Sequence, residues 1–140
     1  MGQKINIDQQ DWLSVILQDA GDAIISKDLN GVITSWNETA EELFGYSAEE
    51  AIGKKGTILY PSDRIQEEDN ILGKIRRGER VKHFKTVRQS KTGDRRNILL
   101  TASPIKNSEG KIIGVSKIAH DITEKKKLEN ALEVNRKQLY

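Results

Sequence analysis

Cysteine does not occur in this 140-residue sequence, and histidine occurs only twice, at His83 and His120. The lack of cysteine excludes disulfides, thiolate nucleophiles, cysteine-ligated zinc and iron–sulfur clusters. It also agrees with a reducing compartment, and we expect a cytoplasmic protein. With only two histidines, a transition-metal site built by the protein is not expected, so no metal ligand is assigned.

Long apolar runs and the common enzymatic motifs are missing as well. The longest apolar runs are three residues, such as 98–100, whereas a transmembrane helix needs about 20. The sequence contains no P-loop, dinucleotide-binding, zinc-protease or serine-hydrolase motif. We therefore expect no membrane segment, and the common catalytic classes are disfavoured.

Charge is distributed unevenly along a chain whose formal net charge is only +2. Residues 1–70 carry 5 basic and 14 acidic side chains, whereas residues 71–140 carry 18 and 7. One interpretation is a basic surface for nucleic acid or an acidic partner. The other is that the two halves fold onto each other and neutralise their charges, which we favour for a chain of single-domain length.

Turn residues, helix caps and apolar spacing predict a mixed α+β chain. Asp28–Gly31 is a tight-turn sequence, Asn37 is suited to cap a helix that Gly45 ends, and Ser47 with Glu50 has capping-box spacing. The expected elements, in order, are a helix over 8–20, strands over 23–27 and 32–36, helices beginning at 37 and 47, a helix over 66–77, strands over 81–89, 95–103 and 112–120, and a helix over 121–140.

The last helix is predicted from a cap and a short heptad pattern. Asp121 and Glu124 form a capping box in its aspartate form. Leu128, Leu132, Asn135 and Leu139 fall on one seam, although the pattern is shorter than a secure coiled coil needs. We divide the chain into a flanking helix (1–21), a core domain (22–121) and a linker helix (122–140) truncated from a longer coiled coil.

Two ordered sets of residues resemble the two halves of a PAS domain. The first half is matched by Asp28-Leu29-Asn30-Gly31, Ile33, Trp36-Asn37, Ala40 and Phe44-Gly45-Tyr46. The second half is matched by Arg80 to Arg88, Gly93, Ser103-Pro104-Ile105, Gly114 and Asp121-Ile122-Thr123. The chain resembles most closely the PAS sensors of bacterial histidine kinases and cyclic-dinucleotide enzymes.

The resemblance implies a fold and a set of functional residues. The expected fold is α+β, a five-stranded antiparallel sheet of order 2-1-5-4-3 with helices on one face. A ligand pocket between sheet and helices is implied for Ile25, Asn37, Ile71, Ile75, Phe84, Thr86, Ile98 and Leu100. A signalling joint is implied at Asp121, Ile122 and Thr123, and a homodimer interface at Trp12, Ile16, Leu128 and Leu132.

Several departures from the family limit which cofactor is expected. Light-sensing flavin members need a cysteine for their covalent adduct, and this sequence has none. Oxygen-sensing members ligate b-type heme through a histidine on the long helix, where this chain has Glu68 near the ligand position. Covalent flavin and b-type heme are therefore not expected, and the ligand, if there is one, stays unidentified.

Some residues admit both a structural and a functional interpretation. His83 is expected to pack on its strand, on the same face as Val81 and opposite to Thr86, rather than to bind a ligand. His120 is interpreted as a solvated residue at a strand end rather than as a pH-sensitive hinge with Asp121. The acidic run 67–69 is expected to favour a helix N-terminus rather than to hold a divalent cation.

The sequence as a whole predicts a sensory and dimerisation module without catalytic activity of its own. A change in ligand occupancy or packing would pass along the last strand to the linker helix and to an effector, such as a histidine kinase, in the parent chain. Two alternatives stay open, namely a constitutive dimerisation scaffold that binds no ligand, and a binder of acidic partners or nucleic acid through the basic strands. We do not expect nucleic acid to be the partner.

Overall fold

The computed structural model of the protein describes residues 21–139, and the predicted helix over 8–20 lies outside these residues. Five strands form a single sheet of order β2-β1-β5-β4-β3 in which all neighbouring strands are antiparallel. The predicted fold class and strand order are therefore confirmed. The strands are β1 (Ala23–Asp28), β2 (Ile33–Trp36), β3 (Val81–Gln89), β4 (Arg95–Lys106) and β5 (Ile112–Asp121).

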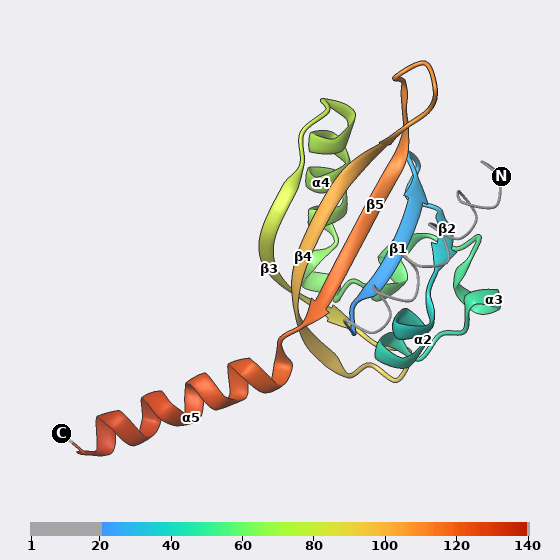
Figure 1. Cartoon of the computed structure of the whole chain (residues 1–140). Helices are drawn as coiled ribbons and strands as arrows, with labels where there is room; N and C mark the ends of the chain where they lie inside the picture. Colours follow the sequence, from blue (N-terminus) through green and yellow to red (C-terminus); the bar gives the residue numbers. More distant parts are fainter. Residues whose placement is uncertain (1–20, 140) are drawn as a thin grey trace, which may run out of the picture.

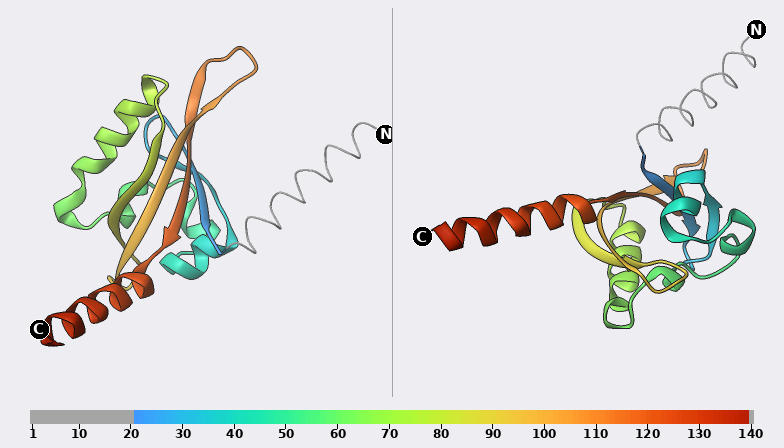
Figure 2. Two further views of the ribbon diagram at one scale, coloured as in Figure 1. Left: turned by 60° about the vertical axis from the view of Figure 1, so that its left-hand side comes forward. Right: turned by 90° about the horizontal axis from the view of Figure 1, so that it is seen from below.

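The helices of the core lie between β2 and β3 in the sequence and cover one face of the sheet (Figures 1 and 2). Helix α4 packs across β3, β4 and β5, and α2 packs on β1. Helix α5 instead projects away from the sheet (Figure 1). The helical elements are α2 (Glu38–Phe44), α3 (Ala48–Ala51), η1 (Gly56–Leu59), η2 (Ser62–Arg64), α4 (Gln66–Arg76) and α5 (Thr123–Leu139).

Local side chains set the ends of the short helices as the sequence predicts. The Asn37 side chain accepts a hydrogen bond from Ala40 N, and Gly45 ends α2 in the left-handed conformation at φ 79°. Ser47 and Glu50 form the predicted capping box at the start of α3. These caps satisfy backbone groups that the helices themselves leave free.

Strand β3 departs from the alternation that we expected. A β-bulge lies between Val81 and Phe84, and His83 adopts a positive φ of 53°. The bulge shifts the register by one residue, so Val81 is buried on the same side as Thr86, whereas we had placed it on the opposite face with His83. His83 itself is exposed.

The interior is mostly apolar, but it contains charged side chains that the sequence analysis did not predict. Phe44, Ile33, Ile75, Ile98 and Val115 are among its largest fully buried side chains. Lys27, Glu68, Arg88 and Lys117 are also buried. No helix within residues 21–139 is long and apolar enough to span a membrane.

The uneven charge of the two halves is explained by contacts between them. Glu50, Asp63 and Glu67 in the first half form ion pairs with Lys91, Arg95 and Arg88 in the second half. Arg96 lies 4.0 Å from Asp121 and Arg77 pairs with Glu79 within the second half. Several cations of the basic strands are thus already engaged by carboxylates.

Candidate functional site

Three cationic side chains point from the sheet into the interior beneath the helices. Lys27 of β1, Arg88 of β3 and Lys117 of β5 are only 3%, 5% and 4% exposed. Alternation along the strand explains why, since Lys27 follows buried Ile25 by two residues and Lys117 lies between buried Val115 and Ala119. The inner face of the sheet therefore presents positive charge as well as apolar surface.

Glu68 of α4 lies between the two buried lysines. Lys27 Nζ donates to Glu68 Oε2 at 3.0 Å and to Oε1 at 3.3 Å, and Lys117 Nζ lies 3.5 Å from Oε1. Glu68 is itself 6% exposed. A single carboxylate is therefore shared by two ammonium groups in a place from which water is largely excluded.

Tyr60, which follows η1, forms another wall of this charged cluster. Its hydroxyl accepts a hydrogen bond from Lys117 Nζ at 3.0 Å, and the Arg88 guanidinium lies 3.8 Å from the centre of its ring. Lys27 Nζ lies 5.3 Å from the same ring centre. The ring thus receives cations on its faces, an arrangement that its quadrupole favours.

Arg88 connects the cluster to a second carboxylate on α4. Its Nη1 donates to Glu67 Oε1 at 2.8 Å and to Thr86 Oγ1 at 3.0 Å. Thr86 in turn donates to Glu67 at 2.6 Å, and Arg64 donates to the other oxygen of Glu67 at 3.0 Å. The first turn of α4 therefore anchors three strands of the sheet, β1, β3 and β5, through consecutive glutamates.

Burial and neighbouring charges shift the proton affinities of this cluster. Burial, with repulsion from Lys117, lowers the pKa of Lys27 to about 8. Burial also lowers the pKa of Lys117. Burial acts to raise the pKa of Glu68, but the two lysines outweigh it and hold that pKa below its ordinary value. The cluster combines an ionised glutamate with lysines that release protons more readily than exposed ones.

Glycines make room for Lys27. A Cβ at Gly56 would lie 2.0 Å from Lys27 Nζ, and one at Gly114 would lie 2.5 Å from the Lys27 carbonyl oxygen. The ammonium side chain therefore occupies space that any other residue at position 56 would fill. The strand pair β1–β5 likewise depends on the missing side chain at Gly114.

A small cavity adjoins the cluster. It has a volume of about 20 Å³ and lies between the sheet, Phe44 and Tyr60. Of the predicted pocket residues it brings together Ile25, Ile98 and Leu100. Its complete lining is Ile25, Lys27, Phe44, Leu59, Tyr60, Arg88, Ile98, Leu100, Lys117 and Ala119.

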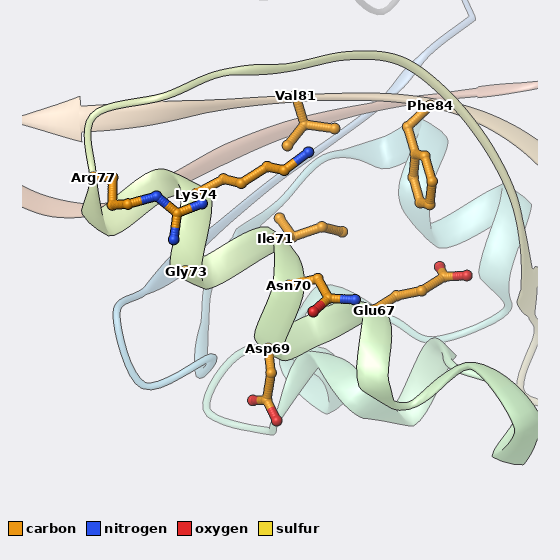
Figure 3. Close-up of a pocket in the computed structure, with 9 residues that line it drawn as sticks. All are labelled: Glu67, Asp69, Asn70, Ile71, Gly73, Lys74, Arg77, Val81 and Phe84. Carbon is orange, nitrogen blue, oxygen red and sulfur yellow. The ribbon is translucent and has the colours of Figure 1, made fainter.

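A larger groove of about 360 Å³ lies between α4 and β3. Figure 3 shows Ile71 of α4 facing Val81 and Phe84 of β3, whereas Asp69 points away from them. This groove brings together the predicted residues Ile71 and Phe84. Glu67, Asn70, Gly73, Lys74 and Arg77 complete its lining.

The other predicted pocket residues have structural contacts of their own. Ile75 is fully buried in the apolar core. Thr86 belongs to the hydrogen-bond network of Glu67 and Arg88. Asn37 is outside the linings of both cavities, and its side chain instead accepts from Ile24 N and Ala40 N.

The predicted joint connects β5 to α5 through short polar contacts. The Asp121 carboxylate accepts from Thr123 N at 2.9 Å and from Thr123 Oγ1 at 2.5 Å. Ile122 N donates to Asn97 O, and Thr123 Oγ1 accepts from Asn97 N. The helix begins at Thr123 rather than Asp121, because β4 still holds the backbone at 121 and 122. The predicted capping box of Asp121 with Glu124 is therefore wrong, since the Asp121 carboxylate accepts from Thr123 instead of Glu124.

The predicted dimer residues divide between two parts of the chain. Leu128 and Leu132 lie one helical turn apart on α5 and are 64% and 68% exposed. Trp12 and Ile16 lie outside the described residues. His120, which we had placed beside Asp121, forms its contact with Asp22 at 2.6 Å.

The sequence analysis missed Lys27, Tyr60, Arg88 and Lys117 as interior residues. A signal for three of them was available, since Lys27 and Lys117 share the strand face of Ile25 and Ala119, and Arg88 shares that of Thr86. They were not predicted inside, because charged residues are rarely buried without partners. Their partners on α4 are far away in sequence.

Comparison with known proteins defines the family of the chain. The PAS-fold family model matches residues 13–122, and the chain therefore belongs to the PAS family. A PAS domain from Colwellia psychrerythraea superposes with a TM-score of 0.68 at 27% identity, over 79% of this chain and 98% of that one.

Two relatives are signalling proteins much longer than this chain. The signal transduction histidine-protein kinase AtoS of Escherichia coli is 30% identical over 120 residues, which are 84% of this chain and 19% of AtoS. Two-component system protein A of Emericella nidulans is 38% identical over 111 residues, which are 76% of this chain and 16% of that protein. The chain thus spans less than a fifth of these relatives.

Proposed function

We propose that this PAS domain is the sensory module of a cytoplasmic two-component signalling protein and has no catalytic activity of its own. The similarity to AtoS and to two-component system protein A supports this role. The observation that carries the proposal is that one strand connects the charged interior to the base of α5. A change at the cluster would then reach a C-terminal effector through that strand.

The geometry of β5 supports such a relay. Lys117, Ala119 and Asp121 alternate onto the same face of this strand. Lys117 contacts Glu68 and Tyr60 inside the domain, and Asp121 holds the first turn of α5. A shift of β5 relative to α4 therefore changes the position at which α5 leaves the sheet.

The relay is tested in a chimera that carries this domain in place of the matching PAS domain of AtoS. We expect Asp121→Ala to remove a cap worth about 0.5–2 kcal/mol, too little to unfold the domain but enough to loosen a short polar helix. Autophosphorylation of the chimera should change, and hydrogen exchange should accelerate over residues 123–130 while residues 98–102 stay protected.

Glu109→Ala, in the exposed β4–β5 turn, is the matched control and should change neither readout. If Asp121→Ala loosens α5 but leaves kinase activity unchanged, the domain is a constitutive scaffold rather than a relay. If exchange accelerates throughout the sheet, Asp121 stabilises the core and the joint is misassigned.

We also propose that the domain forms a homodimer through α5. Leu128 and Leu132 expose apolar surface on one side of a helix whose other exposed residues are mainly charged, a pattern suited to a paired helix. Sedimentation equilibrium of Leu128→Glu/Leu132→Glu should show weaker association, whereas Asn130→Glu on another side of the helix should not. Unchanged association of the double variant would place the interface elsewhere.

A further inference from the structure

The polar side chains that line the small cavity are all hydrogen-bond donors. Lys27, Arg88 and Lys117 have no acceptor atoms when they are protonated, and Tyr60 is the remaining polar lining residue. The Tyr60 oxygen already accepts a hydrogen bond from Lys117. The other lining residues are apolar. A molecule or ion in this cavity would therefore contact hydrogen-bond donors and apolar side chains.

Arg88 has a donor that no described protein atom uses. Its Nη1 contacts Glu67, Thr86 and Val87 O. Its Nη2 is buried and makes no hydrogen bond with any atom of residues 21–139. Leaving a buried charged donor without an acceptor is costly, so an acceptor in the adjoining cavity is favoured.

The cluster also has more positive than negative charge. Lys27, Arg88 and Lys117 line the cavity, whereas Glu68 is the carboxylate shared by the two lysines. Glu67 pairs with Arg88, but it also pairs with Arg64. Buried charge that is not matched by its opposite is strongly unfavourable, so one further negative charge would stabilise the cluster.

The size of the cavity restricts what can supply that charge. Its volume is only about 20 Å³, and a cavity needs roughly 10–15 Å³ to hold one water molecule. A polyatomic metabolite is therefore too large. A water molecule fits, but its two hydrogens would find only the Tyr60 oxygen, which already accepts from Lys117, as a side-chain acceptor among the lining residues. A monatomic anion only accepts hydrogen bonds.

We propose that this cavity binds one small monovalent anion of the size of chloride, held by Arg88 Nη2, the two lysines and the Tyr60 hydroxyl. The anion neutralises the excess charge and provides the missing acceptor for Arg88. Phe44, Leu59 and Tyr60 form the part of its wall that the sheet does not supply. The proposed anion site is argued from the residues around the cavity and does not depend on the proposed relay to α5.

Thermal unfolding at constant ionic strength tests the site, because a ligand that binds only the folded state raises Tm. Chloride and bromide should each raise the Tm of the wild-type domain by a few degrees in a saturable manner. Gluconate, which is too large for the cavity, should not. Equal Tm values in chloride and gluconate would overturn the proposal.

Two variants alter the cavity in different ways. Arg88→Gln removes the guanidinium, and Ala119→Val fills the cavity while keeping every charge, so each should abolish the chloride response. Lys85→Gln, at an exposed position of the same strand as Arg88, makes the same change in net charge and should keep the response. If Arg88→Gln does not fold, Ala119→Val carries the test, and a full response in Ala119→Val would contradict the site.

Crystals of the wild-type domain grown in bromide locate the anion directly. An anomalous peak within hydrogen-bonding distance of Arg88 Nη2 and the two lysine Nζ atoms is expected. Ordered density in the cavity without anomalous signal would identify a water molecule and overturn the proposal. Bromide peaks confined to the surface would overturn it as well.

Discussion

Two regions of the same interior are built on different physics. Around Phe44, the side chains of Trp36, Ala40 and Ile33 exclude water as hydrocarbon, and the Trp36 and Phe44 ring centres lie 5.9 Å apart. Around Glu68, the interior instead holds lysine, arginine and tyrosine side chains. The first region is stabilised by burial itself, and the second only by the match between its charges.

This difference determines how each region responds to change. An apolar core loses stability in proportion to the volume removed from it. A buried ion cluster repays its desolvation only while every partner is present, so removing one member is worse than replacing all of them. The contribution of the ion cluster to stability also depends on pH, whereas the contribution of apolar packing does not.

The largest effect is expected in the apolar region. Phe44→Ala removes a side chain that is 1% exposed, and truncation of buried phenylalanine costs about 3–5 kcal/mol. Urea denaturation should show this loss in the free energy of unfolding. Glu42→Ala, exposed on the same helix, is the control and should stay within about 0.5 kcal/mol of wild type. A loss below 1 kcal/mol would mean that this region tolerates a cavity.

Removing the shared carboxylate is the next largest change. Glu68→Gln leaves Lys27 and Lys117 buried without their counter-charge, and breaking such a pair costs about 3 kcal/mol. Urea denaturation at pH 7 measures this loss. Asp69→Asn, at the adjacent exposed position of α4, makes the same change of charge and should have little effect. Equal stability of the two variants would show that Glu68 is not essential to the cluster.

The pH dependence of stability separates the two regions further. The pKa of Lys27 falls from 10.5 to about 8 in the folded state, so between these values the unfolded chain binds more protons and the free energy of unfolding rises with pH. Below pH 8 both states are protonated and this gain is lost. In chloride-free buffer, we expect a rise of about 1–2 kcal/mol from pH 8 to 9.5.

Lys27→Met provides the control for that measurement, and most of the rise should disappear in it. Trp36→Ala, in the apolar region and outside the lining of the small cavity, should keep the slope while lowering the whole curve. A wild-type stability that falls between pH 8 and 9.5 would contradict the lowered lysine pKa.

The smallest effect is expected when the charged region is converted into an apolar one. The triple variant Lys27→Met/Lys117→Met/Glu68→Leu removes the ion cluster as a unit, and such replacements are often neutral or stabilising. We expect its free energy of unfolding at pH 7 to lie within about 1 kcal/mol of wild type, well above that of Glu68→Gln. If the triple variant is the less stable of the two, the ion cluster contributes net stability.

The elements of the fold could be predicted because their causes are local. Asn37, Gly45 and the pair Ser47–Glu50 act on backbone groups within a few residues, and the structure shows each of them at the predicted cap. The strands over 81–89, 95–103 and 112–120 follow from apolar alternation and polar turns. The bulge at His83 could not be predicted in this way, because it belongs to the pairing of β3 with β4, in which Val81 lies opposite Ala102 and Phe84 opposite Leu100.

The charged part of the candidate site, in contrast, could not be predicted from the local sequence. Apolar members such as Ile25, Ile98 and Leu100 were expected inside, and they line the small cavity. Lys27 and Lys117 were not expected there, because their partners lie far away in the sequence. Glu68 is 41 residues from Lys27, and Tyr60 is 57 residues from Lys117. A lysine is stable in the interior only if a carboxylate from another element arrives at the same point.

The sequence by itself therefore determined the turns and the caps of the short helices, since each depends on neighbours along the chain. The order of the strands was implied only by the resemblance to PAS domains, because β1 pairs with β5 from the other end of the chain. Only the tertiary structure decided which charges are buried. The packing of α4 on the sheet brings Glu68 between Lys27 and Lys117. The energy of a buried charge depends on the distance to its partner, and that distance is a property of the packed structure rather than of the local sequence.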